Sequence, residues 1–305
     1  MKKKIKSAHS IFQKLLNRSK EAGDDFNLLL SRYGMERFLY RLSISEFRDQ
    51  FILKGASLFL VWQGQSYRVT RDADLLGFGS PDPGRINKIF LTLFKIKEQG
   101  DGISYDENSL KIAEIREDNN YDGIRVTLIR QLYNARIPLQ IDIGFGGFGD
   151  AITPAPEEID YPTIFDFPQP KLKAYTRYTV VAEKFEAMIH LGIANSRMKD
   201  FYDIWLMSRL FGFDGNLLNE AIQNTFNRRN TKLPESKPIP FSSAFYDNPG
   251  KQTQWKAFIK KTKPVHGTLE LKTVIKDIEN FLWPVIKPPV KKATGGRWST
   301  EPGWI

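Results

Sequence analysis

The hydrophobic pattern of the chain changes type partway along, and this change constrains the fold more than any other feature of the sequence. Through about residue 150, stretches with strand-like patterning, among them 67–76, 124–129 and 138–143, alternate with helical segments such as 85–97. After Leu172 most of the apolar residues have helical spacing. This order predicts an α+β protein, in which helices pack on a mixed sheet and a mainly helical part follows.

Helical spacing also marks the first part of the chain. Residues 8–21 and 26–43 carry apolar side chains at intervals of three and four, so we expect amphipathic N-terminal helices. Further helices are predicted toward the C-terminus, over 179–191, 199–210, 217–228, 254–261 and 269–282. The expected organisation is a core with N-terminal helices over 1–170, a helical domain that completes the site over 171–283, and a flexible basic tail over 284–305.

Composition limits the chemistry that the chain can perform. It has 305 residues, no cysteine and three histidines, which excludes disulfides, zinc-thiolate sites and cysteine nucleophiles. Catalysis would therefore depend on carboxylates, lysines and arginines. No apolar stretch approaches the roughly 20 residues of a membrane span, and no hydrophobic signal-peptide core follows the basic N-terminus. We expect no membrane partner and a cytoplasmic location.

The net charge of +10 is concentrated at the two ends of the chain. Residues 1–22 carry a charge of +6 and residues 251–305 carry +7, which leaves the middle slightly acidic. Basic surfaces supply most of the non-specific affinity for nucleic acid, because they neutralise phosphates. The charge pattern therefore favours RNA as a partner, although lysine-rich ends can also be merely solvated.

Two carboxylates at Asp72 and Asp74 are the strongest candidates for a metal site. Residues two apart in a strand face the same side, so the two side chains project together. At a separation of about 5 Å and an effective dielectric near 20, their repulsion is on the order of 3 kcal/mol, which a divalent cation would convert into attraction. Magnesium suits such a pair, because it accepts one or two carboxylates and leaves other positions to phosphates. An ion-paired turn is the alternative reading.

A glycine and a serine upstream could bind the phosphates. Gly55 lets backbone N–H groups approach an anion, and Ser57 adds a hydroxyl donor at a helix start. Arg71 precedes the first carboxylate, and it is predicted to bind the nucleotide as well. An alternative is that Arg68 and Arg71 only form surface ion pairs with the two aspartates.

Asp142 is a third carboxylate in a strand-like stretch. Leu139, Ile141 and Ile143 alternate with Gln140 and Asp142, so one face of the strand is apolar and the other presents the charge. Placed beside Asp72 and Asp74, it would complete a cluster able to hold one or two metal ions. The alternative is a lone aspartate that faces solvent.

The helical part offers Lys184 and Asp200. Val181, Phe185 and Met188 form an apolar stripe that leaves Lys184 on another face, where it could reach a phosphate. Asp200 lies at the start of a predicted helix, where a negative charge or an ordinary ion pair is equally expected. His190 is expected on the helix surface or in the core rather than as a general base.

These segments, taken in order, resemble the AbiEii family of nucleotidyltransferase toxins, which belong to type IV toxin-antitoxin and abortive infection systems. The resemblance covers roughly residues 8–283. The stretches that carry it are Lys54–Ser57, Arg68–Leu75, Leu139–Gly146, Ala182–Lys184, Arg197–Ile204 and Gln254–Phe258. One departure is a longer glycine-rich loop over 144–150, where this chain has three residues more than the family pattern.

The resemblance implies a polymerase-beta-like nucleotidyltransferase core that uses magnesium and a nucleoside triphosphate (NTP). It also implies toxicity restrained by a separately encoded antitoxin that acts as a transcription repressor. Carried over by position, Gly55 and Ser57 would bind phosphate, and Asp72 and Asp74 would bind the metal. Lys184 would bind the triphosphate, and Asp200 would be a second essential acid.

The expected activity is transfer of a nucleotide from an NTP to an acceptor, with tRNA 3′ ends as the leading acceptor and pyrophosphate released. Two alternatives stay open at this point. The chain could nucleotidylate a protein or a small molecule, or it could bind NTP or RNA without catalysis.

Overall fold

The computed structural model describes residues 8–64, 72–97, 100–117, 121–146, 152, 154–262, 269–287, 296–300 and 303–305. Contacts within the chain divide it into two compact units. The first unit comprises Met1–Gly149 and Glu157–Ala174, and the second comprises Asp150–Pro156 and Tyr175–Ile305.

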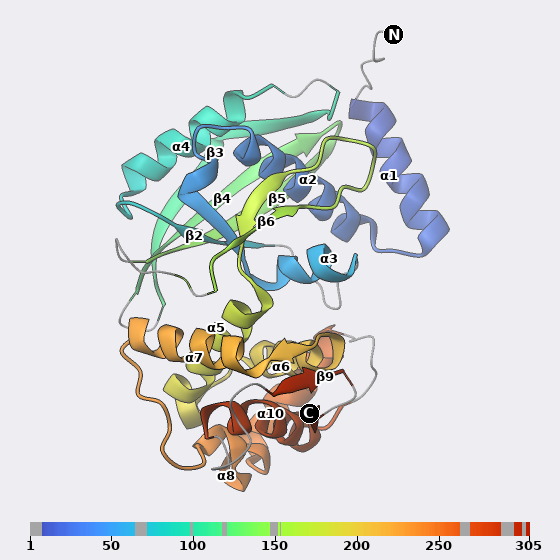
Figure 1. The fold of residues 1–305 in the computed structure, drawn as a ribbon. Helices are drawn as coiled ribbons and strands as arrows, with labels where there is room; N and C mark the ends of the chain where they lie inside the picture. The colour runs from blue at the N-terminus through green and yellow to red at the C-terminus, as the bar shows by residue number, and fades with distance from the viewer. Residues whose placement is uncertain are drawn as a thin grey trace. The chain divides into compact units, whose positions relative to one another are not determined.

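The first unit is built on a seven-stranded mixed sheet (Figure 1). Its strands are β1 (Phe51–Lys54), β2 (Ala73–Gly77), β3 (Ile103–Glu117), β4 (Tyr121–Leu132), β5 (Ala135–Phe145), β6 (Glu157–Asp160) and β7 (Lys171–Ala174), in the spatial order β3-β4-β5-β2-β1-β7-β6. The pairs β5/β2 and β1/β7 are parallel, and the other neighbours are antiparallel. The short strands β1 and β2 therefore lie at the centre, where neighbours on both sides hold them.

Helices of the first unit pack against this sheet and against one another. They are α1 (Ala8–Ala22), α2 (Phe26–Ser43), α3 (Leu58–Gln63) and α4 (Pro83–Lys95), with 3-10 turns η1 (Arg48–Gln50) and η2 (Gly55–Ser57). In Figure 1, α2 runs across the sheet and contacts β5, and α1 contacts α2. Asp25 caps α2 by accepting from the Asn27 and Leu28 amides, so this helix begins where the sequence supplies a side-chain acceptor.

Two buried acidic side chains join α2 to the rest of the first unit. Arg41 donates to the Asp101 carboxylate at 2.6 Å, just before β3, and both side chains are almost fully buried. Glu36 accepts from the Ile164 amide at 2.9 Å. Burial raises the pKa of Glu36 to about 7, because desolvation outweighs the nearby Arg37 charge. These contacts fix α2 against loops far away in the sequence.

The second unit is mainly helical. Its helices are α5 (Arg177–Leu191), α6 (Met198–Leu210), α7 (Gly215–Arg228), α8 (Ser243–Tyr246), α9 (Pro249–Thr262) and α10 (Leu271–Ile286), with 3-10 turns η3 (Gly192–Ala194) and η4 (Ile239–Phe241). The predicted class, a mixed sheet with N-terminal helices followed by a mainly helical part, is thus confirmed. In the part of the chain that is described, no helix has the length and apolar character of a membrane span.

The last residues of the chain form structure that the sequence pattern did not predict. Strands β9 (Arg297–Ser299) and β10 (Gly303–Trp304) pair with each other, and β9 pairs with β8 (Phe213–Asp214). Trp298 is only 3% exposed and donates its indole N–H to the Ser208 carbonyl. The expected flexible tail over 284–305 therefore differs from the structure at these strands. Trp298 and Trp304 hold the strands in place, and two isolated tryptophans give the sequence no apolar periodicity from which strands could be predicted.

Candidate functional site

Four charged side chains form a row across the centre of the sheet in the first unit. Lys54 on β1 pairs with Asp74 on β2, Asp74 pairs with Asp142 on β5, and Asp142 pairs with Arg125 on β4. Residues paired directly across neighbouring strands face the same side of a sheet, so the four side chains share one face. The row brings two carboxylates together between two cations. The predicted placement of Asp142 beside Asp74 is thus observed.

Arg125 holds the Asp142 carboxylate in a fixed orientation. Its Nε donates to Asp142 Oδ1 at 2.8 Å, and its Nη2 donates to Oδ2 at 2.7 Å. This is the two-point geometry that makes arginine–carboxylate pairs both strong and directional. Gln140 Nε2 adds longer contacts of 3.4 and 3.3 Å to the two oxygens. Both oxygens of Asp142 therefore already have an arginine partner in this structure.

Gly55 makes room for the Asp74 carboxylate. Its φ of +78° lies in the left-handed region that disfavours side chains, and a Cβ placed there would come 2.1 Å from Asp74 Oδ2. Such a contact is impossible without movement of the carboxylate. The glycine at the end of β1 is therefore required by the position of the acid on β2, in addition to any contact with phosphate.

Lys54 extends toward β5 over the same face of the sheet. A Cβ built on Gly144 would lie 3.2 Å from the Lys54 ammonium nitrogen. Gly144 follows Asp142 by two residues on that strand, so the ammonium lies over β5 on the face that carries Asp142. A cation in this position lowers the electrostatic cost of holding two acids side by side.

The other predicted residues of the first unit lie at the ends of these strands. Ser57 is buried in η2, which leads directly into α3, and its hydroxyl donates to the Lys54 carbonyl at 3.3 Å. Asp72 is exposed and immediately precedes β2, so it lies just outside the strand that was expected to contain it. Arg71, Arg68 and the loop over 147–150 lie outside the described residues.

Lys184 and Asp200 bind each other within the second unit. The Lys184 ammonium on α5 lies 2.6 Å from Asp200 Oδ1 and 3.0 Å from Asp203 Oδ2, both on α6. The three side chains are between 1% and 13% exposed. Lys184 is therefore largely buried and ion-paired, rather than an exposed helix lysine. His190 is exposed in the last turn of α5, in line with a surface position.

The donors on the sheet suit a hard cation. Across the described ranges, no group of three His, Cys, Asp or Glu side chains is arranged to hold a metal. Magnesium needs only one or two carboxylates, because it keeps water and substrate phosphates in its other positions. The oxygen donors of Asp72 and Asp74 therefore fit magnesium, with Asp142 next to Asp74 and paired with Arg125.

Sequence reasoning did not identify Arg125 as a member of these clusters, and it placed Asp203 one turn from Asp200 without recognising Lys184 as their shared partner. Asp203 lies one turn after Asp200 on the same helix, which is a usable signal for a shared partner. Arg125 alternates with the buried residues Ile124 and Val126, which places it on the open face of its strand. Its pairing with Asp142 depends on strand register, which the pattern did not reveal.

A mixed sheet with central acids on one face, followed by a helical unit, is the architecture expected of the nucleotidyltransferases that the sequence resembles. The model of the nucleotidyl transferase AbiEii toxin family, type IV toxin-antitoxin system, matches residues 37–282. The chain belongs to this family. Membership implies an NTP substrate and an antitoxin partner.

Similar solved structures exist at low sequence identity. JHP933 from Helicobacter pylori is 11% identical, covers 90% of this chain and 92% of its own, and gives a TM-score of 0.46. A chain described as a candidate nucleotidyltransferase from H. pylori is 10% identical, covers 85% of this chain and 94% of its own, and gives a TM-score of 0.45. No curated protein matches the chain in sequence.

Proposed function

We propose that the chain is a magnesium-dependent nucleotidyltransferase toxin that transfers a nucleotide from an NTP to RNA, with the tRNA 3′ end as acceptor. The observation that carries this proposal is the row on the sheet, where Asp74 and Asp142 stand in register on parallel strands beside Asp72. Adjacent acids on rigid strands repel each other, and Lys54 and Arg125 offset part of this repulsion; a bound divalent cation would offset more of it.

The residues have distinct roles in this proposal. Asp72 and Asp74, with Asp142 beside them, would hold the metal, which when bound neutralises and orients the triphosphate. Gly55, Ser57 and Arg71 would bind phosphate oxygens. Arg125 keeps Asp142 in place through its two hydrogen bonds.

The second unit would contribute Lys184 and Asp200. A lysine ammonium is a compact charge suited to a phosphate oxygen. Its ion pairs with Asp200 and Asp203 orient it, so Asp200 would act as an essential acid by positioning Lys184.

The reaction joins the acceptor hydroxyl to the α-phosphorus of the NTP. A bond forms between the hydroxyl oxygen and this phosphorus, and the bond from the phosphorus to the oxygen that leads to the β-phosphate breaks. Pyrophosphate leaves, and the hydroxyl proton is released. The chain's part is to position both reactants and to place the Lys54 cation on the face where the charge develops.

The charge distribution supports RNA as the acceptor. The two ends of the chain carry most of the net positive charge, and such regions bind phosphates without sequence preference. Growth inhibition would then follow from modified tRNA. The antitoxin, proposed to be a transcription repressor encoded separately, would relieve that inhibition.

The test incubates purified protein with magnesium, each radiolabelled NTP and total tRNA, followed by a denaturing gel. We expect label on tRNA from one NTP, and none with Asp74→Asn. A matched control is Asp160→Asn on β6, which removes the same charge from an exposed ion pair with Lys171 in the same sheet. Label on protein or a small molecule instead would replace the RNA acceptor, and no label on any acceptor would contradict catalysis.

A further inference from the structure

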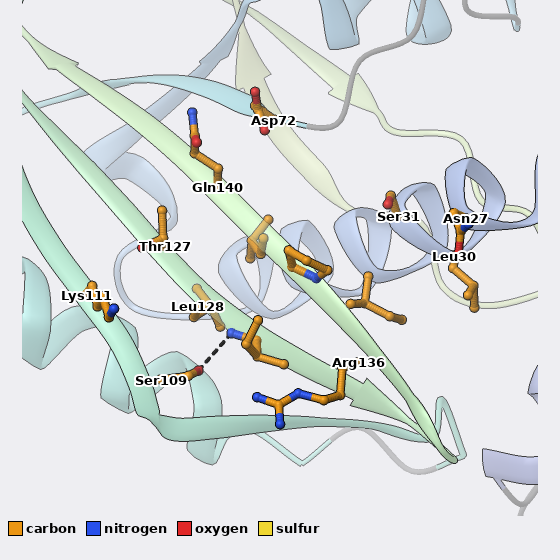
Figure 2. A pocket seen from close by; sticks show the side chains of 14 residues that line it. Asn27, Leu30, Ser31, Asp72, Ser109, Lys111, Thr127, Leu128, Arg136 and Gln140 are labelled. Carbon is orange, nitrogen blue, oxygen red and sulfur yellow. Dashed lines mark hydrogen bonds between the residues drawn. The ribbon is translucent and has the colours of Figure 1, made fainter.

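A cavity of about 690 Å³ lies in the first unit and begins at Asp72. Its size falls in the range of roughly 300–1,000 Å³ that is usual for ligand sites. Asp72 and Gln140 lie at one end of it, and Lys111, Ser109 and Arg136 lie toward the other (Figure 2). The cavity thus connects Asp72, a predicted metal ligand, to the positively charged side chains of Lys111 and Arg136.

The register of the strands fixes the direction of this cavity across the sheet. Thr127 on β4 pairs with Gln140 on β5 and with Lys111 on β3. Gln140 precedes Ile141, the partner of Ala73, so Asp72 and Lys111 are separated by three strand intervals. At about 4.8 Å per interval, the distance is about 14 Å.

A second cation lies along β5 at a similar distance. Arg136, Pro138 and Gln140 alternate on the same face of this strand, and Arg136 is exposed. Four residues of strand correspond to about 13 Å. Two cations therefore stand about 13–14 Å from Asp72, Lys111 across the sheet and Arg136 along β5, in a groove whose walls carry amide and hydroxyl groups.

The sheet order separates this groove from the proposed phosphate-binding residues. Gly55 and Ser57 follow β1, which borders β2 on one side, whereas β5, β4 and β3 border it on the other. The acids before and within β2 thus lie between the two regions. In a transfer reaction the two substrates meet at the metal, so an NTP on the β1 side leaves the groove to the acceptor.

We infer that this groove binds the acceptor as a single strand of RNA, with its 3′ hydroxyl at Asp72 and its trailing phosphates at Lys111 and Arg136. The inference rests on the proposed function, and it adds a binding site for one of the substrates. A ligand with a hydroxyl at one end and phosphates farther back matches the order of charges in the groove. A small polar acceptor would leave the two distant cations without a role.

The test measures RNA binding without any need for turnover. A short single-stranded RNA, labelled at its 5′ end, is titrated by fluorescence anisotropy against the full chain at several salt concentrations. The variant is Lys111→Ala/Arg136→Ala. The matched control, Lys88→Ala/Lys95→Ala, removes the same charge from exposed lysines of α4 that do not line the groove.

We expect the groove variant to bind the RNA about tenfold more weakly than the control, with a slope of log affinity against log salt that is smaller by about 1.4, since each single-strand phosphate contact contributes about 0.7. In the transfer reaction, KM for RNA should rise while kcat at saturating RNA and KM for NTP stay unchanged. Equal RNA affinity and equal salt slope in the two variants would overturn the groove assignment. Absence of transfer by the wild type would contradict the proposed function alone, because the binding measurement still decides the groove.

Discussion

Replacing Gly55 with alanine tests how tightly the backbone after β1 is fitted to Asp74. The added Cβ would lie 2.1 Å from Asp74 Oδ2, and ordinary contacts begin at 3.4 Å, so the oxygen must move by about 1.3 Å. A misplacement of about 1 Å in a catalytic site can cost about 100-fold in rate. The left-handed backbone adds about 1–2 kcal/mol of strain, which lowers the free energy of unfolding.

Gly64→Ala separates these two effects. Gly64 has a similar φ of +69°, but a Cβ there meets no atom of the described residues within 4 Å. We expect urea denaturation to show a comparable loss of stability in both variants. Only Gly55→Ala should lose about 100-fold in kcat/KM for transfer and lose stabilisation by magnesium in thermal unfolding. Activity of Gly55→Ala close to that of Gly64→Ala would refute the proposed fit between the glycine and the carboxylate.

Three further substitutions probe the other charged groups. Arg125→Met removes the side chain that competes with magnesium for the Asp142 carboxylate, so thermal unfolding should show stabilisation at a lower magnesium concentration than in the wild type. If the same magnesium concentration is needed in both proteins, Asp142 is not a magnesium ligand. Lys184→Met removes the cation from its buried ion pairs with Asp200 and Asp203, so urea denaturation should show a loss of about 3–5 kcal/mol in unfolding free energy. An effect under about 1 kcal/mol would contradict the ion pairs. Because the pKa of Glu36 is raised, this residue stabilises the folded state fully when the pH is below 4.5, the ordinary pKa of a glutamate. This stabilisation is lost as the pH rises through about 7. The unfolding free energy of the wild type should therefore fall by about 3 kcal/mol between about pH 5 and about pH 8, and Glu36→Gln should abolish this decline. An equal decline in the wild type and the variant would contradict the raised pKa of Glu36.

The alternating pattern in β5 was enough to place its acid. Leu139, Ile141 and Ile143 are buried, whereas Asp142 lies on the open face in register with Asp74. Local alternation determines which residues lie on each face of a strand, so the sequence alone predicted that Asp142 lies on the face opposite the apolar residues. The position of this strand beside β2 was an assumption, and only the structure establishes that the two strands pair and run parallel.

Partners that come from distant strands or helices could not be predicted. The pairing of Arg125 with Asp142 depends on the register of the β4–β5 hairpin. Lys184 and Asp203 meet because α5 and α6 pack together. Both contacts arise from tertiary packing, which a periodicity argument does not contain.

Strand β3 was not predicted because polar and charged residues interrupt the apolar alternation of its sequence. Several of its residues are charged, and its pairing with β4 shifts register between Asp106 and Lys111. It is an edge strand, and charge and irregularity are common there because they discourage pairing with other chains. The same edge supplies Lys111 to the groove.

The central claim is that Asp72 and Asp74, just before and within β2, hold the magnesium that carries the NTP. Isothermal titration calorimetry with an NTP analogue that cannot be cleaved between its α- and β-phosphates tests it directly, with magnesium and with EDTA. The account predicts that magnesium strengthens binding by about tenfold or more in the wild type and in Asp160→Asn, and that Asp74→Asn loses this gain. Equal magnesium-dependent affinity in Asp74→Asn and the wild type would contradict the account.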